Sequence, residues 1–317
     1  MMKEAIALSE SLAPRIRREA GEGQKRISFS QYSVYESCPH RWYLTYAQGH
    51  YLFSASINTV FGTAIHEAIQ KYLAILFNES VKASDAFDMV EHFEKVFRDE
   101  YIKEVTNNGG AHFSNKQEMS EFYQDGVEIL NYFRKKRVAY FSTKDMELLG
   151  MEIPLLTEIR DITDTFLFNG YIDLVLRDKT DGTIYIEDFK TSTKGWRDYE
   201  KKDEIKQAQI LLYKKYFAKQ FAVEESKIVP RFRILKRKLY ENADFPQSRI
   251  QIHEPANGKA KVHQAGQRLI NFINECFNQD GTAKEKVHTK ITVGNNCRFC
   301  PFKDRDDLCD KKNMFGR

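Results

Sequence analysis

The sequence contains no run of about 18 apolar residues, which is the length that a transmembrane helix needs. Its N-terminal stretch AIALSESLA is interrupted by Glu10 and is too polar for the core of a secretion signal. Early arginines would suit an organelle-targeting peptide, but the acidic residues Glu4, Glu10 and Glu19 argue against one. We therefore expect a soluble, intracellular protein with no membrane partner.

A strong charge of one sign is also missing, and the formal net charge is only +4. A charge this small does not by itself indicate nucleic acid, although residues 135–137 and 236–238 are basic runs that form either binding patches or solvated faces. The P-loop pattern G-x-x-x-x-G-K-[ST] is absent, so ATP-driven unwinding would need a partner. We find no internal repeat and no low-complexity segment.

The number of cysteines is not even, as it would be in a protein whose cysteines all pair in disulfides. The chain has 5 cysteines, and an odd number in an intracellular protein argues against a disulfide framework and favours metal binding or burial. Aromatic residues are plentiful, with 23 Phe and 16 Tyr among 317 residues. These rings are available for the core, for stacking on a ligand, or for both.

The periodicity of apolar residues changes along the chain and predicts an α/β protein with a helical insertion. Alternation typical of strands begins near residue 147, and helical and strand patterns then follow in turn. We expect helices at residues 28–47, 60–77, 84–105, 116–140, 203–220 and 259–278, and strands at residues 147–162, 165–186, 231–237 and 249–253.

One predicted hairpin places charged residues at the end of an apolar strand, in the stretch IYIEDFKTS. A loop at residues 179–182 puts Asp173 opposite Asp188, and alternation adds Lys190 to the same face while Phe189 points to the other. A shorter loop at Asp181 and Gly182 would leave all three charged residues on one face.

Two carboxylates that face each other across a strand pair destabilise it unless a cation lies between them. Hard oxygen ligands suit Mg²⁺ or Mn²⁺, and a nearby ammonium group can orient water or stabilise charge on a phosphate. This chemistry is that of phosphodiester hydrolysis. The alternative is a solvated hairpin end with an ordinary ion pair to Lys190.

Four motifs in this order resemble those of the PD-(D/E)XK nuclease superfamily, specifically its RecB-like branch of CRISPR-associated, helicase-linked and phage nucleases. They are FGTAIHEA, GYIDLV, EDFKTS and QILLY, which span residues 62–213. The resemblance implies a restriction-endonuclease-like core, a small mixed sheet flanked by helices. The residues that match are His66, Asp173, Asp188, Lys190, Gln209 and Tyr213.

The resemblance also implies a role for each matching residue. Asp173 and Asp188 bind the metal, Mg²⁺ or Mn²⁺, with His66 and the main-chain carbonyl of Phe189 as further ligands. Lys190 assists the hydrolytic water. Gln209 and Tyr213 share one helix face and either contact the DNA strand and Lys190 or simply pack the helix. Without the other motifs, His66 alone would be read as an ordinary helical histidine.

The cysteines near the C-terminus predict a second site. Cys297 and Cys300 have two residues between them, and eight residues separate Cys300 from Cys309. A closed tetrahedral site or a cubane cluster needs a fourth ligand, which Cys38 can supply. The segment around Cys38 is similar to that of the iron-sulfur members of the branch, which implies a 4Fe-4S cluster that staples the two ends of the chain. The spacing before Cys309 is longer than in those members, so structural Zn²⁺ and unliganded buried thiols remain alternatives. We interpret Cys276 as a residue of the hydrophobic core.

The resemblance implies DNA as the substrate, as a single strand or a frayed end. The predicted function is that of a metal-dependent exonuclease in recombination, repair, phage DNA processing or CRISPR spacer acquisition. Its expected partner is a helicase, a recombination protein or a CRISPR adaptation protein. Its expected location is the cytoplasm of a bacterial, archaeal or phage-infected cell. A weakly catalytic DNA-end-binding subunit and a zinc-stapled structural protein are the alternatives. The candidate DNA contacts are Arg41, Tyr43, Thr191, Ser192, Lys194 and Trp196.

These predictions divide the chain into an appendage at residues 1–26 and a single nuclease domain at residues 27–317. Within the domain we expect a helical part at about 54–142, a catalytic core at about 145–255, and a C-terminal helix and cysteine segment at about 257–317 that packs with the Cys38 region.

Overall fold

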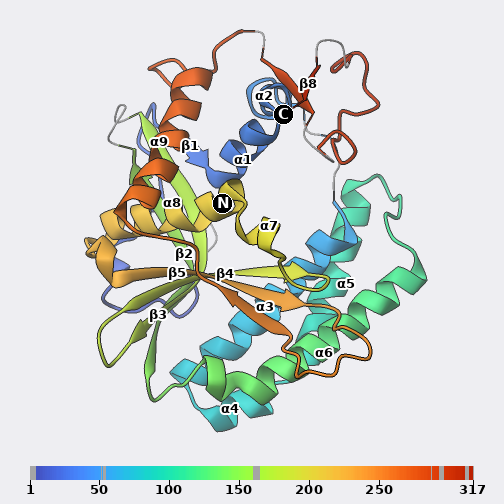
Figure 1. The fold of residues 1–317 in the computed structure, drawn as a ribbon, viewed down its shortest axis with the longest axis vertical. Helices are drawn as coiled ribbons and strands as arrows, with labels where there is room; N and C mark the ends of the chain where they lie inside the picture. Colours follow the sequence, from blue (N-terminus) through green and yellow to red (C-terminus); the bar gives the residue numbers. More distant parts are fainter. Residues whose placement is uncertain are drawn as a thin grey trace.

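The computed structural model describes residues 5–50, 52, 55–159, 165–286, 288–292, 296–310 and 314–316. Its centre is a six-stranded mixed sheet (Figure 1). The strands of this sheet are β1 (Lys25–Ser28), β2 (Met146–Glu158), β3 (Phe166–Asp178), β4 (Ile184–Ser192), β5 (Ile228–Lys236) and β6 (Ile250–His253).

Strand β3 has three neighbours, and this arrangement opens the sheet at one place. Antiparallel β2 pairs with β3 along nearly all its length and occupies one edge. Parallel β1 pairs with the beginning of β3, up to Asn169, while antiparallel β4 pairs with its later part, from Leu174 onward. Because β1 and β4 share the other edge, residues 170–173 of β3 lie between them without a strand partner on that side.

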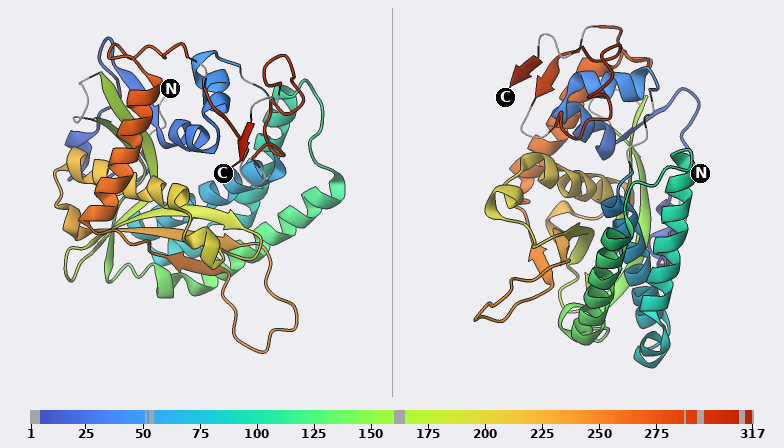
Figure 2. Two further views of the ribbon diagram at one scale, coloured as in Figure 1. Left: turned by 45° about the horizontal axis from the view of Figure 1, so that its top comes forward. Right: turned by 90° about the vertical axis from the view of Figure 1, so that its right-hand side faces the viewer.

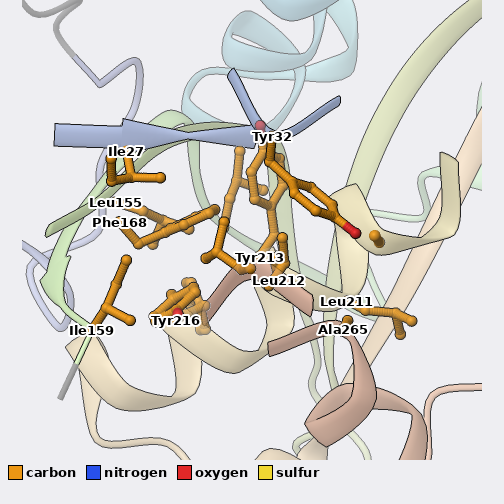
Figure 3. Close-up of a cluster of buried hydrophobic side chains, with 14 of the residues drawn as sticks. Ile27, Tyr32, Leu155, Ile159, Phe168, Leu211, Leu212, Tyr213, Tyr216 and Ala265 are labelled. Atoms are coloured by element: carbon orange, nitrogen blue, oxygen red, sulfur yellow. The ribbon is translucent and has the colours of Figure 1, made fainter. Parts of the chain in front are cut away.

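Helices cover both faces of the sheet (Figure 1). One core cluster joins the sheet to three helices of the predicted helical insertion, and a second cluster (Figure 3) joins it to one early helix and to two helices that follow β4. The first group is α3 (Ile57–Asn78), α5 (Met89–Asn107) and α6 (Lys116–Tyr140), with the short α4 (Val81–Ala86) beside α3; the second is α1 (Phe29–Ser37), α8 (Glu204–Phe221) and α9 (Lys259–Cys276).

Helix α3, which carries His66, follows directly from its sequence. Ser56 and Thr59 form a reciprocal capping box at its N-terminus, which fixes where the helix begins. Ile65, Ile69 and Leu73 recur at helical spacing and are fully buried against α5, α6 and the sheet. This buried face orients the polar face of α3 toward the end of β4.

The aromatic segment 28–47 differs from the single helix that we predicted. Helix α1 ends at Cys38, whose backbone is extended, because Pro39 disfavours the helical conformation in the residue before it. The short helix α2 (Pro39–Trp42) and the π-helix η2 (Tyr43–Ala47) then follow. Strand β1, which we did not predict, ends where α1 begins, and the Ser28 hydroxyl caps that helix.

Residues 5–26 contact the sheet, whereas we expected a polar appendage. Ile6 bridges to Met151 of β2, and Leu12 lies buried in the core beside the short 3₁₀-helix η1 (Ala13–Arg15). Apolar residues spaced among polar ones, as in AIALSESLA, are enough to hold this segment on the sheet edge.

Helix α2 and the C-terminal segment of the chain lie side by side (Figure 2). The backbone N–H of His40 donates to the carbonyl of Thr289 at 3.1 Å, next to β7 (Lys290–Thr292), which pairs in parallel with β8 (Met314–Gly316). The remaining short elements are α7 (Asp198–Lys201), between β4 and α8, and η3 (Glu225–Lys227), before β5.

Candidate active site

The end of β4 brings the charged residues of the hairpin together. Leu174 pairs with Glu187, so the register is the one that places Asp173 beside Asp188, as predicted. The backbone N–H of Phe189 donates to Oδ2 of Asp173 at 2.8 Å, which ties the two strands together where they separate. Phe189 itself is buried toward α3, and Asp188 and Lys190 point to the other face.

Asp188 is a buried carboxylate, with only 2% of its surface exposed. Its Oδ2 lies 2.7 Å from Nζ of Lys190, and the two side chains form an ion pair. The pKa of Asp188 is raised to about 6; burial is the main cause, Lys190 opposes the rise, and Asp173 adds to it. Burial lowers the pKa of Lys190, but Asp188 and Asp173 outweigh it and leave that pKa raised, so the ammonium stays charged at neutral pH.

His66 approaches this pair from α3. Its Nδ1 lies 3.6 Å from Oδ2 of Asp173, and its ring centroid lies 5.8 Å from that of Phe189. Gly62 precedes it by one turn, and a Cβ at that position would lie 3.8 Å from Oγ1 of Thr191. This is an ordinary van der Waals distance, so α3 passes close to the residue after Lys190 without requiring glycine at position 62.

Two further polar residues belong to the site although no motif indicated them. Glu152 of β2 is nearly buried and has a positive φ of 48°, and Nε2 of Gln70, one turn after His66 on α3, donates to its Oε1 at 3.0 Å. The same amide lies 3.2 Å from the carbonyl of Asp173. A single acid inside the apolar run LLGMEIPLL is the signal that would have revealed Glu152.

Gln209 and Tyr213 of α8 lie on the Asp188 side of the sheet, as i, i+4 partners. Nε2 of Gln209 donates to the Tyr213 hydroxyl at 3.3 Å. Burial raises the pKa of Tyr213, and the Asp188 carboxylate adds to the rise. A Cβ at Gly170 would lie 2.9 Å from Cε1 of Tyr213, which gives a physical reason for the glycine of GYIDLV.

An open cleft of about 960 Å³ lies between α3 and the end of β4. Its floor holds Asp173, Lys190 and Thr191, and its wall is the polar face of α3, with His66 and Gln70. This volume is at the upper end of the range for small-molecule sites. Other polar groups along α3 extend the cleft beyond the carboxylates: Asn58, Thr59, Thr63 and Lys71.

The expected DNA contacts fall in two places. Four of them follow Lys190 in the chain, and among these Thr191 lines the cleft. The Ser192 hydroxyl donates to the carbonyl of Gly195, and the Lys194 ammonium lies 4.8 Å from the ring centroid of Tyr240. Trp196 is only 8% exposed, and its centroid lies 4.8 Å from that of Phe232. The other two contacts, Arg41 and Tyr43, lie at the cysteine segment: Arg41 lines its cavity, and Tyr43 stacks on His288.

The four candidate cysteine ligands line one small cavity of about 30 Å³, although Cys38 lies far from the others in sequence. The backbone N–H of Ile291 points at Sγ of Cys38, 3.5 Å away. In the part of the chain that the structure describes, no three or more His, Cys, Asp or Glu side chains are grouped closely enough to hold a metal ion. Cys276 is buried in the core.

Comparisons with known proteins agree with the motifs. A family model described as "PD-(D/E)XK nuclease superfamily" matches residues 26–305. No curated protein matches the chain. Among solved structures the chain is similar to that titled "Crystal structure of SSO0001", with 12% identity over 94% of this chain and 92% of that one and a TM-score of 0.34, which is too low to carry an argument.

Two general properties are consistent with this match. The six-stranded mixed sheet with helices on both faces fits a restriction-endonuclease-like fold. No helix among the described residues has the length and apolar character to cross a membrane. Because the match covers most of the sequence, the chain belongs to the PD-(D/E)XK nuclease superfamily, whose members are generally metal-dependent nucleases.

Proposed function

We propose that the protein is a metal-dependent DNA exonuclease that hydrolyses phosphodiester bonds in single-stranded DNA or at DNA ends. The observation that carries the proposal is that the buried Asp188 carboxylate and the Asp173 carboxylate share the ammonium of Lys190, which lies 2.7 Å from Oδ2 of Asp188. Two carboxylates beside one ammonium leave excess negative charge, and burial makes such charge costly unless a further cation compensates it, so the arrangement favours a bound metal ion.

Asp188 and Asp173 would hold Mg²⁺ or Mn²⁺, with His66 and the main-chain carbonyl of Phe189 as further ligands. The donors fit a hard cation, because most are oxygens and one is an imidazole nitrogen. When bound, the ion would neutralise the two carboxylates and polarise the phosphodiester. Glu152 lies in the same cleft, where Gln70 holds its side chain.

The chain's own residues supply the remaining steps of this proposal. Lys190 stays protonated beside the carboxylates and can hold the attacking water and stabilise charge that develops on the phosphate. The hydrogen bond between Gln209 and Tyr213 supports the α8 wall behind Asp188. The polar face of α3 gives the strand a path past His66.

The cysteine site would hold a 4Fe-4S cluster, with structural Zn²⁺ as the alternative. What supports a shared site is that four thiols line one cavity and a backbone N–H is directed at Cys38, although the described side chains do not lie at metal-ligand distances from one another. Its role would be to staple the two ends of the chain and to support DNA contact through Arg41 and Tyr43. The cellular role would be in recombination, repair, phage DNA processing or CRISPR spacer acquisition, with a helicase, recombination or CRISPR adaptation protein as partner.

Cleavage of end-labelled single- and double-stranded DNA tests the proposal. Anaerobically purified protein would be compared with Lys190→Ala and Asp173→Asn, in Mg²⁺ or Mn²⁺ against EDTA. We expect metal-dependent degradation that both variants lose, with the polarity visible from the labelled end. DNA binding without cleavage under any metal would contradict the proposal and favour the DNA-end-binding subunit.

A further inference from the structure

A second, smaller chamber borders Lys190 on the side of α8. Its volume is about 330 Å³, which is near the lower limit for a small-molecule site. The large cleft is lined by α3, whereas this chamber is lined by α1, α7 and α8, and Lys190 and Thr191 border both. A strand that crosses Lys190 from the cleft therefore meets this chamber next.

Aromatic rings form part of the chamber wall. Phe29 of α1 is only partly buried, and Trp196 presents its small exposed fraction here while Phe232 supports its ring from behind. The Lys206 ammonium lies 5.2 Å from the Trp196 centroid and fixes one side of that ring. Walls of this kind suit a flat, uncharged ring.

The polar groups of the chamber favour a base over a phosphate. Oε1 of Glu200 lies 3.2 Å from Nζ of Lys206, and its Oε2 accepts the backbone N–H of Arg197 at 3.1 Å. Each carboxylate oxygen keeps a further lone pair, which can accept a hydrogen bond from an amino group but repels a phosphate. Ser33 and Gln209 add a hydroxyl and an amide to the same wall.

We propose that this chamber binds one unpaired nucleobase of the substrate strand, next to the phosphodiester that Lys190 faces. Bases with an exocyclic amino group bind better than thymine, because Glu200 can accept a hydrogen bond from that group. The inference rests on the proposed nuclease function and narrows its substrate to a single strand, since a paired base has its hydrogen-bonding edge occupied.

Tryptophan fluorescence tests the chamber without requiring cleavage. The chain has 2 tryptophans; Trp42 is fully buried, so a change on titration with deoxynucleoside 5′-monophosphates reports Trp196. We expect dAMP, dCMP and dGMP to change the signal at lower concentrations than dTMP. Trp196→Phe should abolish the change, and Phe29→Ala should weaken binding by about tenfold, as loss of one stacking ring does.

Matched variants make the test specific. Glu200→Gln should remove the discrimination against dTMP and, being only partly buried and nearly isosteric, should leave the fold intact. Tyr199→Ala removes an aromatic side chain that is 69% exposed and outside the chamber, and it should bind nucleotides like the unaltered protein. Equal binding by Phe29→Ala, or unchanged discrimination by Glu200→Gln, would overturn the inference.

The outcome also separates this inference from the proposed function. If the protein cleaves DNA but its tryptophan fluorescence does not change on titration with nucleotides, the base chamber is overturned and the nuclease function stands. Nucleotide binding with the expected variant pattern, in a protein that cleaves no DNA under any metal, would support the chamber and contradict the nuclease.

Discussion

At the end of β4, residues that serve the proposed chemistry lower the stability of the folded protein. Alternation along the strand was enough to place Asp173, Asp188 and Lys190 together, and the pairing of Leu174 with Glu187 confirms the predicted register. The same alternation places Glu187 on the opposite face. Burial then raises the pKa of Asp188 to about 6, so the ionised carboxylate is held at a cost to the fold.

Asp188→Asn should therefore stabilise the metal-free protein by about 1 to 3 kcal/mol above pH 6 while abolishing cleavage. The pKa of Asp188 is higher in the folded than in the unfolded chain, so the ionised group lowers the free energy of unfolding at high pH. Below pH 6 the native Asp188 becomes protonated, and the difference should shrink. Chemical denaturation in EDTA on both sides of pH 6 measures it, with the surface variant Asp99→Asn as control.

A loss of stability in Asp188→Asn, at every pH, would contradict this account. It would mean that the ion pair with Lys190 outweighs the burial of the carboxylate.

Other site residues escaped prediction because their positions depend on tertiary contacts. Glu152 reaches the cleft through a positive φ beside a register shift in β2, and strand periodicity alone does not show such an irregularity.

Whole elements were predictable where the pattern was long. The bounds of α6 are those expected from the sequence, and α3, α8 and α9 differ from expectation by only a few residues. Short elements were missed, because the four residues of β1 are too few to show a period. Contacts between helices could not be predicted either, since they depend on which faces meet.

The crossing of α5 and α6 provides one test at this scale. A Cβ at Gly126 would lie 2.3 Å from Cζ of Phe93, and that ring is fully buried among Phe61, Phe97 and Tyr123. Gly126→Ala should gain about 1 kcal/mol of helix propensity but lose more to overpacking, for a net loss of about 1 to 2 kcal/mol. Denaturant titration measures the change, and adding Phe93→Leu should restore most of it. A stabilised single variant would contradict the close crossing.

The pairing of β4 with β5 depends on a buried ion pair. Nε and Nη2 of Arg233 donate to the two oxygens of Glu187 at 2.7 Å each, and both side chains are almost fully buried. Glu187→Ala should cost about 3 to 5 kcal/mol, because it leaves the guanidinium buried without its partner. Glu187→Leu with Arg233→Met should recover part of this loss in urea unfolding. An equal loss in the double variant would show that shape, rather than charge, governs the position.

At the scale of the whole molecule, the C-terminal segment packs against the region of α1 and α2. Besides the backbone bond of His40, the Asn296 amide donates to the Ser37 carbonyl at 3.0 Å, and Nε2 of His40 lies 3.0 Å from the carbonyl of Leu308. The resemblance of the cysteine pattern was the only sequence signal for this contact. These polar contacts and the stacking of Tyr43 on His288 hold the junction, and a metal bound by the cysteines would add to its stability.

This reasoning predicts unequal effects for two cysteines. Cys309→Ser should lose the bound metal, iron if the site holds a cluster and zinc if it does not, and residues 296–310 should then be cleaved faster by protease. Cys276→Ser should keep the metal, because that thiol lies in the core away from the cavity. Elemental analysis of anaerobically purified protein and limited proteolysis measure both effects. Metal retained by Cys309→Ser at the level of the unaltered chain would show that the four thiols do not form one site, since a tetrahedral thiolate site that loses one ligand binds its ion far more weakly.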